Sequence, residues 1–501
     1  MSNLKFGWAE VSLTQDKKVA LAGQFAERIS QYVEKPITAT AMAVSSDEEQ
    51  MILVSCDLVA ISYNLVEAVR SRLEGNMVGI DPMKVVISAI HTHTGPVYPR
   101  YGRFKDLKSS PRAILEALLP EGKKYVEKEN VSDNPDISSP AETFTFLVER
   151  ITEVILQAWE NRKKGAFTNA FGRAAVGMCR RAVYNDGSAQ MWGDTNQAVF
   201  VEIEGSSDTG IELLYVFDED KKLTGIVANL ACPAQCVQHR LFVSPDFWGE
   251  AKELVRKRLG KDVYLLALCS AAGDQCPVDL VRWVEPYSDV NDPNIERKHP
   301  LKRKADPSMF DLEGMRKVGK RIANEIIEVY EEGPGDVQEN PELIHHVHLM
   351  QLPVRRATLE QEIEAKKAIK EYLREKDGDV DYNDSAKLQR YTGVIRRMEL
   401  QDIYDTLDTE VHIMRLGTIA IATNPFELFL DYGNQIKARS HAEQTFLIQL
   451  ANGTEGYLPT EKAERGGHYS AFISSGQVGH EGGDQLVRET LKDINTNLFA
   501  E

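Results

Sequence analysis

Two histidines two residues apart stand out, because an imidazole can bind a metal ion or carry a proton near neutral pH. His91 and His93 lie in the segment HTHTGP, directly after the mainly apolar residues 85–90. That run, closed by Gly95 and Pro96, predicts a buried strand that ends at a turn. Side chains two residues apart on a strand point to opposite sides, so the spacing favours one metal ligand and one substrate contact. The alternative is a pair of polar residues at a strand end.

The residues before this segment predict the elements that would position it. Residues 51–57 (MILVSCD) have the composition of another buried strand, and the apolar residues of 59–73 recur at helical spacing. Strand, helix and strand in this order predict a β-α-β unit. In parallel α/β sheets the carboxyl ends of the strands face the site, so His91 would lie at such an end.

A second predicted strand end carries other reactive side chains. Residues 223–230 and 262–268 resemble buried strands, and the segment 248–259 between them has helical spacing. The second strand runs into CSAAGDQCP, which contains Asp274 and Cys276. A buried strand that delivers a carboxylate, a thiol and small residues to a turn is a suitable place for chemistry.

Two arginines enter a predicted hairpin. Residues 180–184 and 188–192 are joined by Asn-Asp-Gly, a strong hairpin signal. Arg180 and Arg181 at its start are expected on a solvated face, with a substrate clamp as the alternative.

The carboxyl third returns to strands and then to a loop with two tyrosines. Apolar and β-branched composition predicts three strands, at 411–416, 418–423 and 445–450. Residues 424–427 contain a proline and predict the start of a helix, with Glu427 where strand gives way to helix. The glycine-rich loop that follows the last strand holds Tyr457 and Tyr469, twelve positions apart, which is unusual for a structural connector.

Composition limits the class of protein. The chain has 501 residues, of which 42% are hydrophobic and 27% charged. This composition is typical of a soluble globular protein with a large buried core. Its formal net charge of -17 argues against nucleic acid or an anionic membrane as the main partner. No apolar run is long enough for a transmembrane helix, and the start lacks the apolar region of a secretion signal. Six dispersed cysteines predict reduced thiols, so we expect a cytoplasmic protein.

Three polar segments interrupt the strands and helices. Residues 103–140 and 283–307 are charged and proline-containing, and both are expected on the surface, the first near the proposed site. Residues 358–402 are rich in helix formers around an acidic turn, which predicts an inserted helical hairpin. Its charged faces are expected to be solvated or to form a homo-oligomer.

Together these loops resemble the neutral/alkaline, non-lysosomal ceramidase family, zinc-dependent amidases of sphingolipid metabolism that cleave the N-acyl bond of ceramide. Residues 90–96 match the family motif T-H-T-H-S-G-P, and 9–14 resemble its opening segment. The resemblance implies an α/β fold with a mixed β-sheet core flanked by helices, in a single catalytic domain over 1–501. It also implies a hydrolase of linear amide bonds with one zinc ion per chain.

The resemblance also implies roles for individual residues. Its zinc ligands correspond to His91, Glu427 in the P-x-E-F segment, and Tyr457. Its substrate contacts correspond to His93, Arg180 and Tyr469.

Two cysteines depart from the family pattern. Cys232 stands where the family has a zinc-binding histidine, and Cys276 where it has a serine proposed as catalytic. Thiolates bind zinc well and are good nucleophiles, so we expect Cys232 to be the remaining metal ligand. If Cys232 does not bind the metal, His239 is the alternative ligand, and Cys232 would be a buried structural thiol.

The substrate and mechanism follow as expectations. The family's carboxyl-terminal β-domain does not fit into the 44 residues after Tyr457 (501 minus 457), and the chain is acidic with charged insertions, so a polar N-acyl substrate is favoured over long-chain ceramide. Zinc-activated water would attack the amide, Asp274 would accept its proton, and a thioester on Cys276 is the competing route. Other possibilities are hydrolysis of an ester, lactone or glycoside, and a non-catalytic binding protein on the same scaffold.

Overall fold

The computed structural model describes most of the chain. The described residues are 4–24, 27–76, 79–100, 109–126, 134–281, 309–333, 335–338 and 341–500. The predicted surface segment 283–307 lies outside them, as do parts of 103–140. Within the described residues, none of the helices combines the length and the apolar character needed to cross a bilayer.

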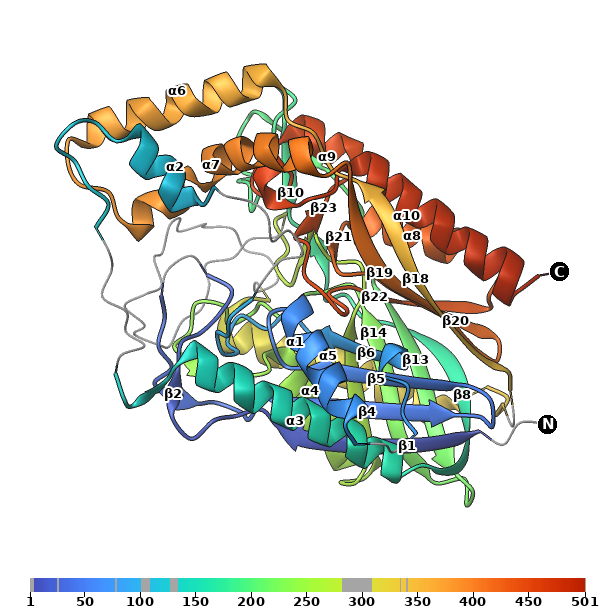
Figure 1. Cartoon of the computed structure of the whole chain (residues 1–501). Helices are drawn as coiled ribbons and strands as arrows, with labels where there is room; N and C mark the ends of the chain where they lie inside the picture. The colour runs from blue at the N-terminus through green and yellow to red at the C-terminus, as the bar shows by residue number, and fades with distance from the viewer. Residues whose placement is uncertain are drawn as a thin grey trace.

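A mixed eight-stranded sheet forms the centre of the molecule (Figure 1). Its order is β16 (Tyr264–Cys269), β14 (Leu223–Leu230), β13 (Gly210–Asp218), β8 (Lys163–Arg173), β1 (Lys5–Ser12), β4 (Thr38–Ser45), β5 (Gln50–Cys56) and β6 (Val85–Ala89). Neighbours are antiparallel except at the two ends, where β5 pairs with β6 and β14 with β16 in parallel. Both parallel pairs coincide with strands predicted from the sequence, and their continuous apolar runs fit strands that are buried on both faces.

The sheet curls so that its two halves approach one another. Strands β1 and β8 share only two register pairs, Lys5 with Lys164 and Phe6 with Lys163. Strand β16 therefore also lies against β4, β5 and β6, and the Ser55 hydroxyl donates to the Ala267 carbonyl across the interior. This curl is what allows loops from opposite ends of the sheet to meet.

A second sheet closes the core, and helices cover the outside. It has the order β18 (Leu343–Pro353), β19 (Thr406–Leu416), β20 (Ile419–Thr423), β22 (Gln444–Ile448). Both sheets contribute to one apolar cluster, which contains Met42, Leu53, Leu266, Met414 and Phe446. The outer faces are covered by α1 (Tyr63–Glu74), α3 (Pro140–Glu160), α4 (Phe247–Leu259), α5 (Asp311–Glu332), α8 (Leu430–Arg439) and α10 (His480–Lys492). The predicted fold class, a mixed sheet core flanked by helices, is confirmed.

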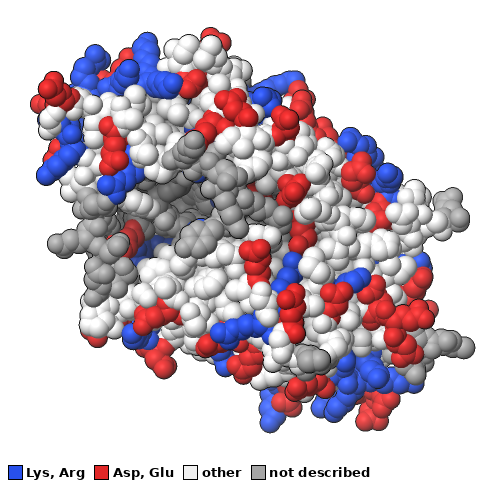
Figure 2. Space-filling model, viewed as in Figure 1, with Lys and Arg blue, Asp and Glu red and all other residues white. Residues whose placement is uncertain are grey.

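Three helices form a separate lobe beside the sheets (Figure 1). They are α2 (Pro111–Leu118), α6 (Leu359–Lys376) and α7 (Tyr382–Ile403). Their own small core includes Leu115, Ile369, Leu373 and Leu388. Figure 2 shows basic and acidic side chains intermingled over this face of the molecule.

One predicted element is wrong. Residues 424–427 do not start a helix: Glu427–Leu428 is a short strand, β21, which pairs in parallel with β23 (Tyr457–Leu458), and α8 begins at Leu430. The reason is that a helix from Pro425 would need the Phe429 N–H to donate to the Pro425 carbonyl. Instead the Phe429 N–H donates to the Leu458 carbonyl at 3.3 Å, and the Pro425 carbonyl accepts from the Glu455 N–H at 3.0 Å. Glu427 and Tyr457 thereby become partners across a two-strand ladder.

Candidate active site

The two histidines lie side by side because the strand before them ends early. Strand β6 stops at Ala89, and His91 adopts a left-handed conformation with φ of 67°. The rings of His91 and His93 have centroids 5.0 Å apart, and their Nε2 atoms are separated by 3.3 Å. The expected divergence of the two side chains does not occur, because it applies only to an extended backbone.

The proton positions on both imidazoles follow from their neighbours. His91 Nδ1 lies 2.6 Å from the Val59 carbonyl, which can only accept, so Nδ1 carries the proton and Nε2 presents a lone pair. The Gln235 side-chain oxygen accepts from Arg180 Nη1 at 3.2 Å, which turns the Gln235 amide N–H toward His93 Nε2 at 3.0 Å. The Nε2 lone pair of His93 is therefore taken by Gln235, whereas the Nε2 lone pair of His91 is left to face Glu427.

A carboxylate and a phenol complete this cluster. Glu427 Oε2 lies 3.5 Å from His91 Nε2, and the Tyr457 phenol is hydrogen-bonded to Glu427. Burial lowers the pKa of His91, and the negative charge of Glu427, which raises this pKa, offsets only part of the effect. The imidazole is therefore neutral and can offer its lone pair to a metal ion. Burial and the Glu427 carboxylate both raise the pKa of Tyr457, which keeps its proton unless a cation replaces it. Tyr469 packs edge-on against Tyr457, with ring centroids 6.0 Å apart.

The cluster has the donors that a zinc ion requires. Tetrahedral zinc with Zn–N distances of 2.0–2.1 Å separates its ligand atoms by about 3.3 Å, close to the 3.5 Å between His91 Nε2 and Glu427 Oε2. The lone pair of neutral His91 faces the Glu427 carboxylate, and a cation between them would relieve the repulsion of the two groups. The His91 Nδ1 bond to a backbone carbonyl is also the arrangement that orients metal-binding histidines.

Arg180 is buried, which corrects the expected solvated face. It is 2% exposed, and Arg181 is 0% exposed. Strands β10 (Arg181–Tyr184) and β11 (Ala189–Met191) form the predicted hairpin, but it packs inward, where Arg181 pairs with Glu204 and donates to Ser470. Arg180 donates to Gln235 and to the Gly273 carbonyl, and its charge acts on Tyr457, Tyr469 and Glu427. Arg180 therefore lies within the cluster.

Cys232 lies beside the cluster but points elsewhere. Its thiol is fully buried and donates to the Val176 carbonyl, with an S–O distance of 3.4 Å. The donor atoms of His91, Cys232 and Glu427, all described residues, do not lie within 4.8 Å of one another. Burial raises the pKa of Cys232 well above its ordinary value. Its role as a ligand stays a prediction that requires the sulfur to leave Val176; the alternative, His239, packs against Phe310.

Asp274 and Cys276 are buried behind the cluster. The Asp274 carboxylate accepts the Leu430 N–H at 2.9 Å, at the start of α8, and burial raises its pKa to about 6. Cys276 donates to the Val278 carbonyl, and burial raises its pKa to about 12 in spite of nearby Arg180. Cys276 is therefore a neutral thiol at neutral pH, which disfavours the thioester route.

Two residues that the motifs did not indicate hold the cluster in place. Gln235 joins Arg180 to His93, and Arg28 donates to the carbonyls of His93, Gln238 and Arg240. Gln235 lies between two cysteines in a predicted loop, so its polar amide was the only available signal. Arg28 has no signal in sequence, because its partners are backbone groups far along the chain.

Comparisons with known proteins identify the fold. No protein-family model and no curated protein matches the sequence. The structure matches the neutral ceramidase of Pseudomonas aeruginosa with a TM-score of 0.67 at 15% identity, over 100% of this chain and 75% of that one. It also matches a ceramidase complexed with C2, with a TM-score of 0.64 at 14% identity, over 99% of this chain and 75% of that one. The chain therefore has the fold of the neutral ceramidases.

Proposed function

We propose that this protein is a zinc-dependent hydrolase that cleaves the N-acyl amide bond of a polar substrate. The observation that carries the proposal is the meeting of three groups: the free Nε2 lone pair of His91 faces the Glu427 carboxylate at 3.5 Å, and the Tyr457 phenol is hydrogen-bonded to that carboxylate. The ceramidase fold supports the reaction class, since the two neighbours named above are ceramidases.

The metal would be held by His91, Glu427 and Tyr457, with Cys232 as the predicted further ligand. When bound, zinc supplies a Lewis acid that lowers the pKa of water from about 15.7 to about 7 and so provides hydroxide at neutral pH. The protein would provide the remaining contributions: binding the amide, stabilising the charge that develops on its oxygen, and moving protons.

His93, Tyr469 and Arg180 are the groups proposed to act on the substrate. In the reaction the carbonyl oxygen gains negative charge, and donors fixed before the reaction stabilise it without reorganising. Arg180 is held by Gln235 and Gly273, and His93 by Gln235 and by the Arg28 bond to its carbonyl. These contacts supply the rigidity that such stabilisation needs.

The polarity of the cluster supports a polar substrate. The buried guanidinium of Arg180, the phenol of Tyr469 and the imidazole of His93 offer donors to hydroxyl, carbonyl or carboxylate oxygens of a ligand. A hydrocarbon chain beside them would leave those donors without partners, at a cost of about 1–3 kcal/mol each. N-acyl amino sugars and short N-acyl amines are accordingly the favoured substrates.

A substrate screen tests the proposal. The zinc-loaded chain is incubated with N-acyl amino sugars, N-acyl amines, ceramide, esters, lactones and glycosides, and the released amine, acid or sugar is measured. We expect turnover of the polar N-acyl compounds above that of ceramide. Preferred cleavage of an ester, lactone or glycoside would assign the alternative hydrolase reaction, and tight binding without any turnover would assign a binding protein.

The proposed role of Asp274 predicts a pH profile. A general base must be ionised, so a pKa of about 6 predicts that kcat/KM falls below pH 6 and is level above it. Replacing Asp274 with asparagine is expected to lower kcat by at least about 100-fold and to flatten that acid limb. Initial rates measured from about pH 4.5 to about pH 8.5, a range that includes this pKa, check both points.

The same measurements separate the competing explanations. If Asp274→Asn lowers only the thermal stability and leaves kcat intact, the carboxylate merely holds the start of α8. If Cys276→Ser abolishes turnover while the fold is retained, the thiol is the nucleophile and the proposed water mechanism is wrong.

A further inference from the structure

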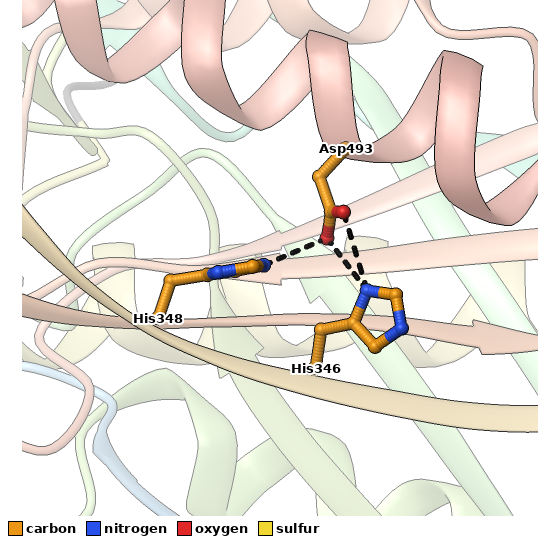
Figure 3. Close-up of side chains that lie close together, drawn as sticks. All are labelled: His346, His348 and Asp493. Atoms are coloured by element: carbon orange, nitrogen blue, oxygen red, sulfur yellow. Dashed lines mark hydrogen bonds and ion pairs between the residues drawn. The ribbon is translucent and has the colours of Figure 1, made fainter.

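Two histidines and an aspartate that do not belong to the candidate active site meet at a second place in the fold (Figure 3). His346 and His348 alternate on strand β18, so both point to the same face of the sheet. Asp493 begins η4 (Asp493–Leu498), the π-helical turn that continues α10. Its Oδ2 lies 3.0 Å from His346 Nδ1 and 3.0 Å from His348 Nε2, and its Oδ1 lies 3.2 Å from His346 Nδ1.

The spacing of these atoms fits a metal ion. One donor atom from each of the three residues lies within 4.8 Å of the others, and no other group of three His, Cys, Asp or Glu donors in the described part of the chain does so. A tetrahedral ion with ligand distances of 2.0–2.1 Å needs its donors about 3.3 Å apart. Asp493 Oδ2 lies 3.0 Å from both imidazole nitrogens, and these separations reach that value with shifts of a few tenths of an ångström.

The surroundings orient the ligands and leave a way in. Asp493 is 6% exposed, and the Asn497 amide donates to its Oδ1 at 2.6 Å, which fixes the carboxylate. Burial by itself would raise the pKa of Asp493, but the bonds from Asn497 and the two histidines hold it below its ordinary value. The histidine side chains are 35% and 40% exposed and line an open cavity of about 720 Å³. An ion could enter from this cavity, and water or a ligand could occupy its remaining position.

We propose that His346, His348 and Asp493 form a second metal site, which binds a first-row divalent transition ion such as Zn²⁺. Two imidazoles and one carboxylate select such ions over Mg²⁺ and Ca²⁺, which prefer oxygen ligands alone. The site joins β18, the edge strand of the second sheet, to the carboxyl end of α10. Its occupancy therefore cross-links two elements that are remote in sequence and stabilises the folded chain by mass action.

The alternative is an aspartate that pairs with two histidines and needs no metal. The two arrangements differ in their response to an ion, because only the metal site gains stability from Zn²⁺. They also differ in pH dependence: metal binding strengthens as the imidazoles lose their protons, whereas an ion pair strengthens as they gain them.

The experiment removes the candidate active site first, so that the two sites are counted separately. The double variant His91→Ala/Glu427→Gln is stripped with chelator and titrated with Zn²⁺ or Co²⁺ at pH 7.5, where free imidazoles are largely unprotonated. We expect one ion per chain by elemental analysis, visible absorption of the bound Co²⁺, and a higher melting temperature with Zn²⁺. Adding His346→Ala or His348→Ala should weaken binding at least about tenfold and remove the stabilisation.

The matched control is His441→Ala. His441 is an exposed histidine in the turn that follows α8, and it does not belong to the proposed metal site. It should leave both the stoichiometry and the melting shift unchanged. The proposal is wrong if the folded double variant binds no ion, or if it binds one that survives both His346→Ala and His348→Ala. Either result leaves the proposed hydrolase untouched, since that activity is measured in the chain with His91 and Glu427 intact.

Discussion

Replacing His91 with alanine is expected to abolish binding of the proposed zinc ion and to lower kcat/KM by at least about 1,000-fold. The imidazole contributes the best-oriented donor of the cluster, because its Nδ1 is tied to the Val59 carbonyl and its Nε2 lies 3.5 Å from Glu427. Glu427→Gln should have the same consequence, because it removes the negative charge that balances the ion. Zinc content after dialysis and turnover of the best substrate from the screen measure both effects.

The zinc count is made in a His348→Ala background, so that the second proposed site does not contribute. His93→Ala is the informative comparison, because His93 is proposed to contact the substrate: zinc should remain while turnover falls. Full zinc occupancy in both His91→Ala and Glu427→Gln would refute the ligand set. Cys232→Ala then decides the open position, since loss of zinc from that variant assigns the thiol as a ligand.

Replacing Asp311 with asparagine is expected to lower the free energy of unfolding by about 3–5 kcal/mol. Asp311 Oδ1 and Oδ2 accept from Arg240 Nε and Nη2 at 2.7 Å each, and both side chains are at most 7% exposed. Asparagine keeps the shape, but it removes the carboxylate charge that accepts two hydrogen bonds from buried Arg240. The pair joins the start of α5 to the loop after β14, which carries Gln235.

The matched control for this prediction is an exposed pair of the same type. Arg356 and Asp405 lie 3.2 Å apart, with side chains 58% and 92% exposed. Asp405→Asn should cost no more than about 0.5 kcal/mol, because solvent screens exposed pairs. Urea denaturation followed by circular dichroism gives both values. Equal costs for the two substitutions would show that burial of Arg240 does not govern the stability of the pair.

Much of the fold was predictable because its strands are local patterns. Strand β14 has the predicted bounds 223–230, and β5, β6, β16, β20 and β22 lie where apolar runs predicted them. The Asn-Asp-Gly turn likewise predicted the β10–β11 hairpin. These signals depend on neighbouring residues alone, since burial on both faces and turn geometry are written in consecutive side chains.

Other predictions failed where distant backbone groups compete with local preference. The proline before Glu427 favoured a helix, but pairing of β21 with β23 supplied the hydrogen bonds instead. The two arginines of the hairpin were expected in solvent, but carbonyls and carboxylates from other segments compensate their burial. No local pattern contains those partners.

The sequence by itself indicated which residues could carry out chemistry: His91, His93, Glu427 and the two tyrosines are recognisable by type and motif. Only the tertiary structure decided where their protons lie, that Arg180 is buried, and that Gln235 and Arg28 hold His93. It alone also brought Asp493 to His346 and His348. The physical reason is that ligand geometry and proton positions depend on contacts between residues far apart in the chain, whereas side-chain identity does not.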